Sequence, residues 1–347
     1  MGIDWILAYL FAGLILKVEH KIQMTQAAIK NNLTLKLESV PCPSCGSSDF
    51  ENVITAPDFE TDYCCLFNVV QCTVCGLAYT SPRPTQNDLF RYFYNDNYVC
   101  YTRSGIADSI RETYLCKARY KALKSVFLRL RPDGSPGRFL DVGCSYGYFL
   151  SYLKSSTNWD VEGCEPSRDM AAQAIERGLD VKATTLVGAG YPSNSFDLVY
   201  MSHVLEHVPD LKATVDEVFR ILRPGGIFIT ENPDFDAPIR IHFGQSWWGY
   251  HLPRHLTHFT FKTMTALLHN AGFEVEAIKP CFRPGPIAWS VQNYLKSKGY
   301  PRRICSLFGV QNPLFVALCA FPALAFLRKG HTDMMETLAR KPQGETP

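Results

Sequence analysis

Short apolar runs alternate with amphipathic segments along the second half of the chain. An apolar run bounded by turn residues is typical of a buried strand, and apolar residues that recur roughly every three to four positions are typical of a helix packed on one face. Strands are expected over 139–142, 160–165, 179–182, 196–201, 226–231 and 274–279, and helices over 148–154, 167–177, 211–222 and 263–270. This regular alternation predicts an α/β fold with a doubly wound parallel sheet.

The regions that flank this domain have other patterns. Aromatic residues are frequent after residue 86, and apolar residues at helical spacing between Tyr114 and Phe127 predict a packed helix. After the sheet, the stretch from Pro284 to Leu327 is largely apolar but is interrupted at Pro322. It is too short to span a bilayer, which needs about 20 apolar residues. We expect a hydrophobic cap over a substrate site, with peripheral membrane contact as the alternative.

Composition and charge restrict the class of partner. The 347 residues are 46% hydrophobic and 20% charged, with a net charge of +2, which is ordinary for a globular protein with a sizeable core. A protein that binds nucleic acid usually has a strong basic excess or a basic stripe. Residues 41–80 contain no Lys or Arg. No nucleic-acid partner is therefore expected.

Cysteine spacing predicts a zinc ribbon. Cys42 and Cys45 form one C-x-x-C pair, Cys72 and Cys75 form another, and a Gly follows each pair. Four thiolates from two such turns suit tetrahedral zinc, and the Gly lets the backbone fold around the ion. Because four protein ligands leave no open position, the predicted zinc is structural.

The remaining cysteines carry no such pattern. Cys64 and Cys65 lie in the spacer of the ribbon and are expected to be bystanders. Metal-bound thiolates beside unpaired cysteines in a long chain indicate a reducing compartment, so a cytoplasmic location is expected. The apolar run Trp5–Leu16 lacks the features of an export signal. We expect a membrane-surface contact, a packing helix, or a segment upstream of a start at Met24.

The chemistry of the sheet domain concentrates in RFLDVGCSYG, residues 138–147. The first strand ends in Asp141, and the chain then turns through Gly143 and Gly147, as it does where a doubly wound sheet opens its ligand crevice. Glu165 ends the next strand, where an acid can accept hydrogen bonds from a ribose diol. The loop lacks the G-x-G-x-x-G spacing that a dinucleotide needs. A sulfonium nucleotide without phosphates fits D-x-G-x-x-x-G better.

These motifs resemble those of class I S-adenosylmethionine-dependent methyltransferases, specifically the group with an N-terminal zinc ribbon and small-molecule or saccharide-type substrates. The resemblance extends from residue 41 to about 340. LDVGCSYGYFL matches the first motif and VEGCEPS the second, while SFDLVYMSHVLEHVPD, ILRPGG and PRHLTHFT match later blocks. It implies a Rossmann-like methyltransferase sheet with a small zinc-ribbon module. It also makes residues 334–341 the last, antiparallel strand of that sheet.

The resemblance further implies the cofactor, S-adenosylmethionine, and the residues that hold it. The first-motif loop would line the methionine end, Glu165 would hold the ribose, and later turns would flank the adenine and close the crevice beneath it. In that order, the implied residues are Asp141, Gly143, Cys144 and Gly147; Glu165; Thr185 and Leu186; and Ser202 and His203. Ser145 stands where many members of the group have a glycine.

With the ribbon and the cofactor domain assigned, five regions are expected. They are an N-terminal apolar or helical extension (1–40), the zinc ribbon (41–85), a helical linker or cap (86–136), the S-adenosylmethionine-binding domain (137–280), and a C-terminal helical cap with the final strand (281–347).

The binding site for the methyl acceptor is expected in the aromatic segment that follows the fifth strand. This segment ends in WWGYHLPRHLTHF. Three histidines there, His251, His255 and His258, titrate near neutrality. Methyl transfer is an in-line displacement that depends on alignment, and a hydroxyl acceptor also needs a base. His255 or His251 is the predicted base, and Arg254 is expected to orient the substrate or pack on a tryptophan. The alternative is a structural lid with hydrogen-bonded histidines.

One motif has a second interpretation. HVLEH, residues 203–207, fits the inverted zinc-peptidase pattern H-x-x-E-H. That chemistry needs both histidines on one helical face. Here the motif directly follows a strand and meets Pro209 within a turn, so the helix would be too short. A turn in the crevice wall, with His207 packed locally, is expected instead.

The sequence therefore predicts an enzyme that transfers a methyl group from S-adenosylmethionine to a hydroxyl, or to a carbon, of a small-molecule, sugar or lipid-linked intermediate. The alternative is a methyltransferase that its zinc ribbon targets to a macromolecule, either protein or RNA. The lack of basic residues in the ribbon weighs against RNA. The oligomeric state is left open.

Overall fold

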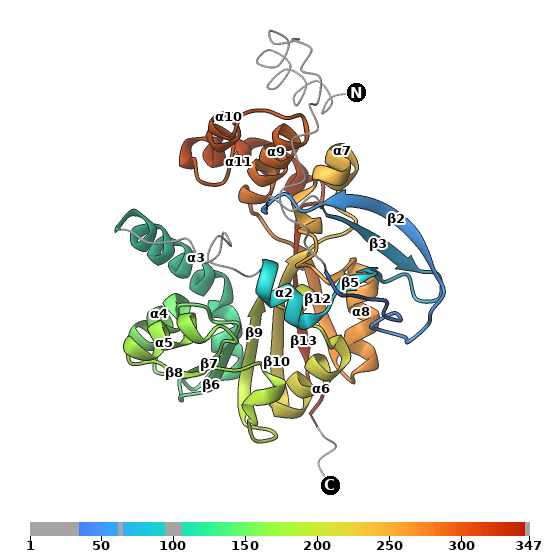
Figure 1. Cartoon of the computed structure of the whole chain (residues 1–347). Coiled ribbons are helices and arrows are strands. Elements are labelled where there is room, and N and C mark those ends of the chain that lie inside the picture. Colours follow the sequence, from blue (N-terminus) through green and yellow to red (C-terminus); the bar gives the residue numbers. More distant parts are fainter. Residues whose placement is uncertain (1–34, 62–64, 94–105, 344–347) are drawn as a thin grey trace.

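The computed structural model describes residues 35–61, 65–93 and 106–343. The expectations for Trp5–Leu16 and Cys64 fall outside these ranges. The described chain forms a seven-stranded sheet with helices on both faces, a four-stranded ribbon sheet beside it, and a group of C-terminal helices (Figure 1).

The large sheet has the strand order β12-β13-β10-β9-β6-β7-β8. Its neighbouring strands are parallel except at β13, which is antiparallel to both β10 and β12. The strands are β6 (Arg138–Val142), β7 (Asp160–Cys164), β8 (Asp180–Lys182), β9 (Phe196–Ser202), β10 (Leu222–Pro233), β12 (Glu274–Pro280) and β13 (Met334–Arg340). The predicted doubly wound sheet and its last antiparallel strand are confirmed.

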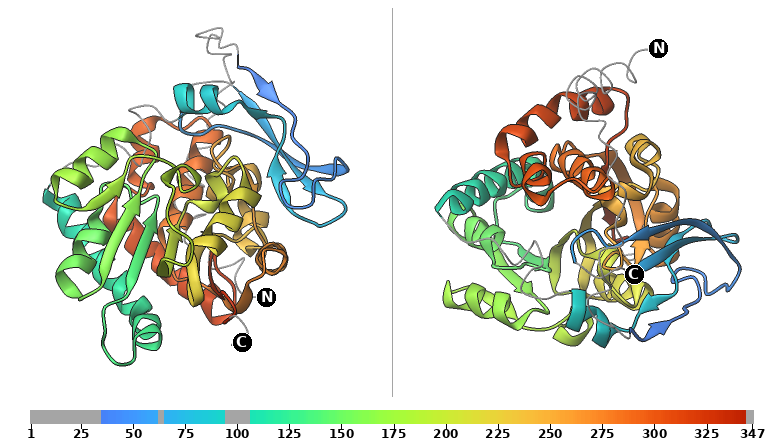
Figure 2. Two further views of the ribbon diagram at one scale, coloured as in Figure 1. Left: turned by 90° about the horizontal axis from the view of Figure 1, so that it is seen from below. Right: turned by 45° about the horizontal axis from the view of Figure 1, so that its top comes forward.

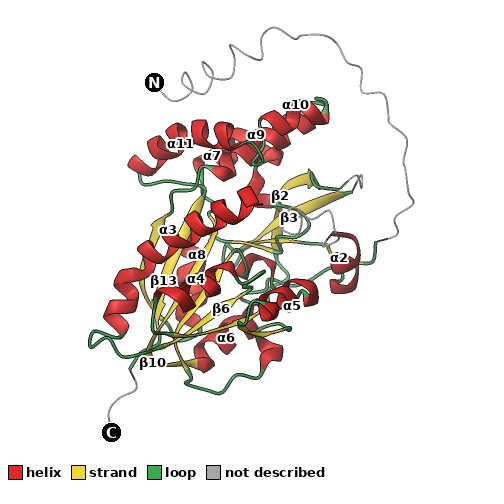
Figure 3. Cartoon of the chain, turned by 90° about the vertical axis from the view of Figure 1, so that its left-hand side faces the viewer, coloured by secondary structure: helices red, strands yellow, loops and turns green. Residues whose placement is uncertain are grey.

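Two helical layers cover the sheet (Figure 3). Helices α3, α4 and α5 pack on one face, and α6 and α8 pack on the other. Local signals in the sequence start several of them: Ser167 accepts from the Met170 N–H, Asp210 accepts from the Ala213 N–H, and Thr260 forms a capping box with Thr263. The helices are α3 (Ile106–Leu130), α4 (Tyr148–Ser156), α5 (Arg168–Glu176), α6 (Leu211–Ile221) and α8 (Phe261–Asn270).

The ribbon sheet consists of β2 (Phe50–Pro57), β3 (Leu66–Cys72) and β4 (Ala78–Thr80), joined by β11 (Thr257–His258) from the far end of the chain. Thr257 pairs with Tyr79 and His258 pairs with Ala78. A small pair of strands, β1 (Leu37–Glu38) and β5 (Arg83–Pro84), leads into helix α2 (Gln86–Phe93). The sequence predicted the ribbon as a separate module, whereas the structure completes its sheet with a strand of the large domain.

The C-terminal helices lie together over the edge of the sheet at which β10 ends (Figures 1 and 2). Helix α9 packs on α11 and on the turns η3 and η4, which follow β10 and α7. The elements are α7 (Pro238–Phe243), η3 (Gly244–Ser246), η4 (Trp248–Tyr250), α9 (Gly285–Ser297), α10 (Arg302–Leu307) and α11 (Pro313–Arg328). Among the described residues, no helix is both long enough and apolar enough to cross a membrane.

Candidate cofactor and acceptor site

The loop after β6 has a backbone that only small residues accommodate easily. Gly143 and Gly147 have φ of 70° and 73°, in the left-handed region. A Cβ on Gly143 would lie 2.5 Å from Cγ2 of Val204, and one on Gly147 would lie 2.4 Å from Cδ1 of Leu179. The two glycines predicted from the motif are therefore required by conformation and by packing.

Ser145, the departure from the family pattern, adopts this same left-handed conformation, with φ of 52°. Its N–H donates to Oε2 of Glu165 at 3.0 Å, which joins the glycine loop to the end of the next strand. A non-glycine residue in this region is uncommon and tends to occur at functional sites. Serine at this position therefore keeps the glycine-like loop.

Glu165 lies at the carboxyl end of β7 and is buried. Its Oε1 accepts from the Ser167 N–H at 2.8 Å and its Oε2 from the Ser145 N–H at 3.0 Å. Burial raises the pKa of Glu165, although both backbone hydrogen bonds act in the opposite direction. A carboxylate has about four acceptor sites, so each oxygen retains a lone pair for a further donor. This orientation suits a ribose diol.

Asp141, at the end of β6, is the second buried acid of this region. Burial raises its pKa to about 7, the nearby Arg119 acts to lower it, and Glu165 adds to the increase. Two acids whose ionisation is disfavoured by burial suit a cationic ligand, because a bound cation would stabilise their charged forms. The residues present therefore fit a sulfonium nucleotide with an ammonium group.

The other predicted cofactor residues lie in different environments. The Cys144 side chain packs against Gly163 in the core, where a Cβ on the glycine would lie 2.7 Å from the sulfur. Leu186 is buried, while Thr185 is exposed and its Oγ1 accepts from the Gly188 N–H at 3.2 Å. Only the backbone of Cys144 is therefore available to a ligand.

Ser202, at the end of β9, belongs to a polar network that the sequence did not predict. Its Oγ donates to Oε2 of Glu231 at 3.0 Å and lies 3.4 Å from Nη2 of Arg119. Glu231, at the carboxyl end of β10, accepts from Nη2 of Arg283 at 2.9 and 3.1 Å. Burial alone would raise the pKa of Glu231, but the guanidinium groups of Arg283 and Arg119 lower it to about 2.

His203 follows β9 and differs from the other histidines of the site in its exposure. It has φ of 56°, and 40% of its side chain is exposed. Its Nδ1 lies 3.3 Å from Oε1 of Glu206, a buried carboxylate whose Oε2 accepts from Nδ2 of Asn232 at 2.7 Å. The ring also makes an edge contact with Trp248, with centroids 5.9 Å apart. This is an imidazole at the sheet edge, oriented by a buried carboxylate.

The two histidines predicted as bases, His255 and His251, lie deeper. His255 is 2% exposed, its Nδ1 donates to the Gly249 carbonyl at 2.8 Å, and burial lowers its pKa well below the usual range. Nε2 of His251 lies 3.0 Å from Oε1 of Glu60, in the ribbon. His258 is also buried, with a pKa lowered to about 3 by burial and by Arg240. These positions favour the alternative of a structural segment.

Arg254 neither faces a substrate nor packs on a tryptophan, which corrects the expectation from the sequence. It is 1% exposed, and it donates to Oδ1 of Asp58 at 3.0 Å and to the Phe93 carbonyl at 2.9 Å. Thr80 donates to the His255 carbonyl at 2.7 Å. The segment around Arg254 therefore holds the ribbon against the large domain.

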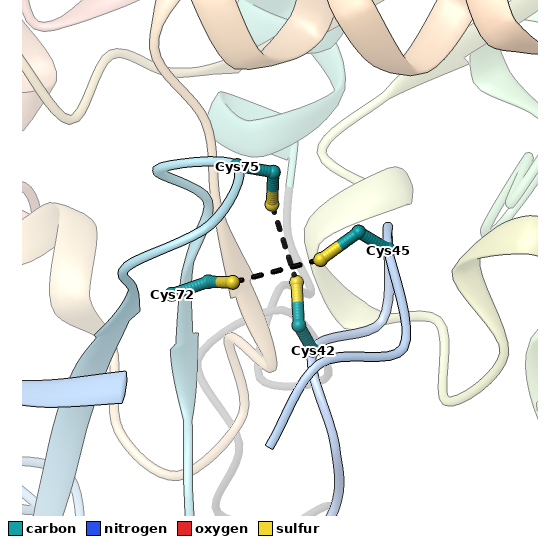
Figure 4. Close-up of side chains that lie close together, drawn as sticks. All are labelled: Cys42, Cys45, Cys72 and Cys75. Carbon is teal, nitrogen blue, oxygen red and sulfur yellow. Dashed lines mark hydrogen bonds between the residues drawn. The ribbon is translucent and has the colours of Figure 1, made fainter. Parts of the chain in front are cut away.

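The four ribbon cysteines converge as predicted. Figure 4 shows their sulfur atoms pointing toward one another, two from the loop before β2 and two from the turn after β3. Sγ of Cys42 lies 3.4 Å from Sγ of Cys75, and Sγ of Cys45 lies 3.6 Å from Sγ of Cys72. Tetrahedral zinc with bonds of about 2.3 Å would place its sulfurs roughly 3.8 Å apart. The cluster therefore fits one zinc ion after a small expansion.

The H-x-x-E-H motif lies mostly in a short turn, as expected. Leu205–His207 forms a single 3-10 turn, η2, between β9 and α6. Glu206 is buried against Asn232, and Nδ1 of His207 donates to the Arg254 carbonyl at 3.1 Å. The helix that an inverted zinc peptidase needs is not formed by these described residues.

Comparison with known families supports the resemblance inferred from the motifs. A family model described as a methyltransferase domain matches residues 114–278. These residues include β6 to β10 and most of β12 of the large sheet. The match covers a little under half of the chain and supports the prediction of a methyltransferase enzyme.

Curated relatives carry names of the same class. A protein of Mycolicibacterium smegmatis, described as a probable S-adenosylmethionine-dependent methyltransferase, is 32% identical over 153 residues, covering 44% of this chain and 57% of the relative. A cycloartenol-C-24-methyltransferase of Arabidopsis thaliana is 32% identical over 181 residues, covering 47% and 52%. The chain thus spans about half the length of these relatives.

Among solved structures, a Haemonchus contortus phosphoethanolamine N-methyltransferase in complex with S-adenosyl-L-methionine is similar, with a TM-score of 0.45 and 16% identity over 77% of this chain and 63% of that chain.

Proposed function

We propose that the protein transfers a methyl group from S-adenosylmethionine to a hydroxyl, or to a carbon, of a small-molecule, sugar or lipid-linked acceptor. The observation that carries the proposal is the pair of buried acids, Asp141 and Glu165, beside a glycine loop with left-handed backbone. The cofactor, when bound, supplies an electrophilic methyl group on a sulfonium. Asp141 would pair with its ammonium group, and Glu165 would accept from its ribose.

The acceptor would lie over the ends of β9 and β10. Ser202, Glu231 and Arg283 offer hydrogen-bond donors and acceptors there, in keeping with a polar acceptor group. We assign the base to His203 in preference to His255 and His251, because His203 is partly exposed and is oriented by Glu206. Accepting a proton from a hydroxyl would place the new positive charge next to the Glu206 carboxylate, which stabilises it.

The ribbon cysteines Cys42, Cys45, Cys72 and Cys75 would hold a structural zinc ion. The support is their convergence from two turns that the sequence separates by 26 residues. Such an ion would keep the ribbon folded without entering the chemistry, because all four positions are taken by thiolates.

Calorimetry with S-adenosylmethionine tests the cofactor assignment. Glu165→Ala removes an acceptor for the ribose, and a hydrogen bond to a charged group contributes about 1.5–3 kcal/mol. We expect the affinity to fall roughly 10- to 150-fold. Glu176→Ala, an exposed acid at the end of α5, is the matched control and should leave the affinity unchanged. Equal affinity in Glu165→Ala and wild type would reject the site. Incubation with an isotopically labelled methyl donor, followed by mass spectrometry, would identify the acceptor.

A further inference from the structure

A second group of potential metal ligands lies where the ribbon meets the large domain. His207, on the turn η2, approaches His251 and His255, which come from a segment 44 to 48 residues further along. One ring nitrogen from each of the three lies within 4.8 Å of the others. We propose that these three histidines bind a divalent transition-metal ion, with zinc the best match, in a site separate from the four cysteines.

The local backbone presents two of the ligands together. The N–H of His255 donates to the His251 carbonyl at 3.1 Å, which closes a non-helical turn in which His251 has left-handed backbone with φ of 36°. This turn brings the two rings together, with their centroids 4.9 Å apart. Nδ1 of His251 lies 3.4 Å from Nε2 of His255. Two nitrogens at about 2.0–2.1 Å from a tetrahedral zinc ion would be roughly 3.3–3.4 Å apart.

In two of the three rings the outer nitrogen donates to a backbone carbonyl, and in the third it faces a carboxylate. Nδ1 of His207 donates to the Arg254 carbonyl at 3.1 Å, and Nδ1 of His255 donates to the Gly249 carbonyl at 2.8 Å. Nε2 of His251 faces Oε1 of Glu60 at 3.0 Å. Metal-bound histidines almost always make such a bond, because it fixes the ring and makes the coordinating nitrogen more basic. The inner nitrogens, Nε2 of His207 and of His255 and Nδ1 of His251, are the ones a metal would take.

The ligand types and the surroundings also fit a transition metal. Neutral imidazoles suit zinc, copper, iron and nickel better than magnesium or calcium. Oε1 of Glu206 lies 3.9 Å from Nε2 of His255 and adds a carboxylate beside the three rings. A small cavity of about 10 Å³ lined by Glu60, His251 and Trp289, among others, lies on the ribbon side of His251.

The position of the site gives it a structural role. Glu60 comes from the ribbon, and the histidine pair comes from the segment that bonds Asp58 and Thr80 of the ribbon. A metal held there would fix the ribbon on the large domain. It would also lie behind Glu206, which orients His203. The proposal does not depend on methyl transfer, because its readout is metal content.

The test uses the full-length protein, stripped with a chelator and then dialysed against zinc. We expect two zinc ions per chain by mass spectrometry of the metal, and an X-ray absorption spectrum that contains both sulfur and nitrogen ligands. His251→Gln and His207→Gln should each reduce the content to about one ion with sulfur ligands only. His269→Gln, an exposed histidine of α8, is the matched control and should retain two.

The wild-type spectrum keeps the test decisive even if a variant fails to fold. One zinc ion per chain with sulfur ligands only would reject the histidine site and leave the cysteine site standing. Two ions with an unchanged nitrogen contribution in both folded histidine variants would also reject it. Failure of the cofactor experiment would affect neither result, since zinc content is measured without S-adenosylmethionine.

Discussion

The two halves of the carboxyl edge of the sheet hold buried acids in opposite electrostatic settings. At the end of β6, burial raises the pKa of Asp141 to about 7. At the end of β10, burial acts on Glu231 in the same direction, but two guanidinium groups lower its pKa to about 2. The acid at the end of β6 could therefore be stabilised in its charged form by a bound cation. The charge of Glu231 is already balanced by the two guanidinium groups. The contrast fits the proposed division of this edge into a cofactor half and an acceptor half.

The largest expected effect removes the proposed base from the acceptor half. His203→Gln should lower kcat about 10²- to 10⁴-fold, the usual contribution of general base catalysis. The cofactor affinity should fall less than in Glu165→Ala, because His203 would not pair with the ammonium or ribose groups. Labelled methyl transfer and calorimetry measure the two quantities separately. His255→Gln is the comparison variant. If it lost more kcat than His203→Gln, His255 and not His203 would be the base.

The next effect tests whether Glu231 is stabilised by its partner. Arg283→Met should lower the free energy of unfolding by roughly 1–3 kcal/mol, because it removes one cation from a buried carboxylate. The estimate lies below that for a fully buried pair because 42% of the Arg283 side chain is exposed. Urea unfolding measures it, with Arg303→Met, an exposed arginine of α10, as the control. Equal loss in both variants would mean that the pair contributes nothing.

The cofactor half should make binding depend on pH. S-adenosylmethionine would bind the ionised form of Asp141, whose pKa in the free protein is about 7. Its affinity should therefore fall up to about tenfold for each pH unit below 7. Calorimetry across pH 5.5 to 8.5 tests this. Asp141→Asn should bind more weakly and lose this pH dependence, and an unchanged pH profile in that variant would contradict the assignment.

The same two acids predict opposite contributions to stability. Glu231 has a folded-state pKa below its unfolded value, so its contribution is present above about pH 4.5 and is lost as the pH falls toward 2. Asp141 has a raised folded-state pKa, so its contribution is present below about pH 3.8 and is lost as the pH rises through 7. The free energy of unfolding of Asp141→Asn, relative to that of wild type, should therefore be higher at pH 8 than at pH 4. Unfolding curves at the two pH values measure the difference.

The smallest expected effect concerns the helices above the acceptor half. Helix α11 buries Phe315 and Cys319 but leaves Leu314, Leu318 and Phe321 exposed, with Arg328 at its end. We expect weak binding to anionic vesicles through this apolar stripe and its basic end. A Phe321→Ser variant should reduce co-sedimentation a few-fold. Equal sedimentation of wild type and variant would contradict peripheral membrane contact through this stripe.

Local signals predicted most of the large domain. The strand ends at Asp141 and Glu165 follow from short apolar runs, and the glycines at 143 and 147 mark a turn that needs left-handed backbone. The helix predicted over 167–177 begins at Ser167, whose side chain accepts from the nearby Met170 N–H. These features were readable because each depends on residues close together in the chain.

Contacts between distant segments were not readable in this way. Arg119 lies in a region predicted only as a helical cap, yet it reaches Ser202 at the end of β9. Arg283 reaches Glu231 from 52 residues further along. Glu231 is a charged residue on an otherwise apolar strand. This was the one available signal that a side chain of opposite charge had to pair with it.

The sequence by itself determined the sheet, the glycine loop with its two acids, and the two cysteine pairs, because strand periodicity, turn geometry and ligand spacing are local properties. Only the tertiary structure decided which histidine stands at the crevice. It exposes His203, buries His255, places His251 half-buried against Glu60 of the ribbon, and brings His207 beside them. The physical reason is that exposure and ligand convergence depend on how β11 and the ribbon pack on the large domain, and no local pattern encodes that packing.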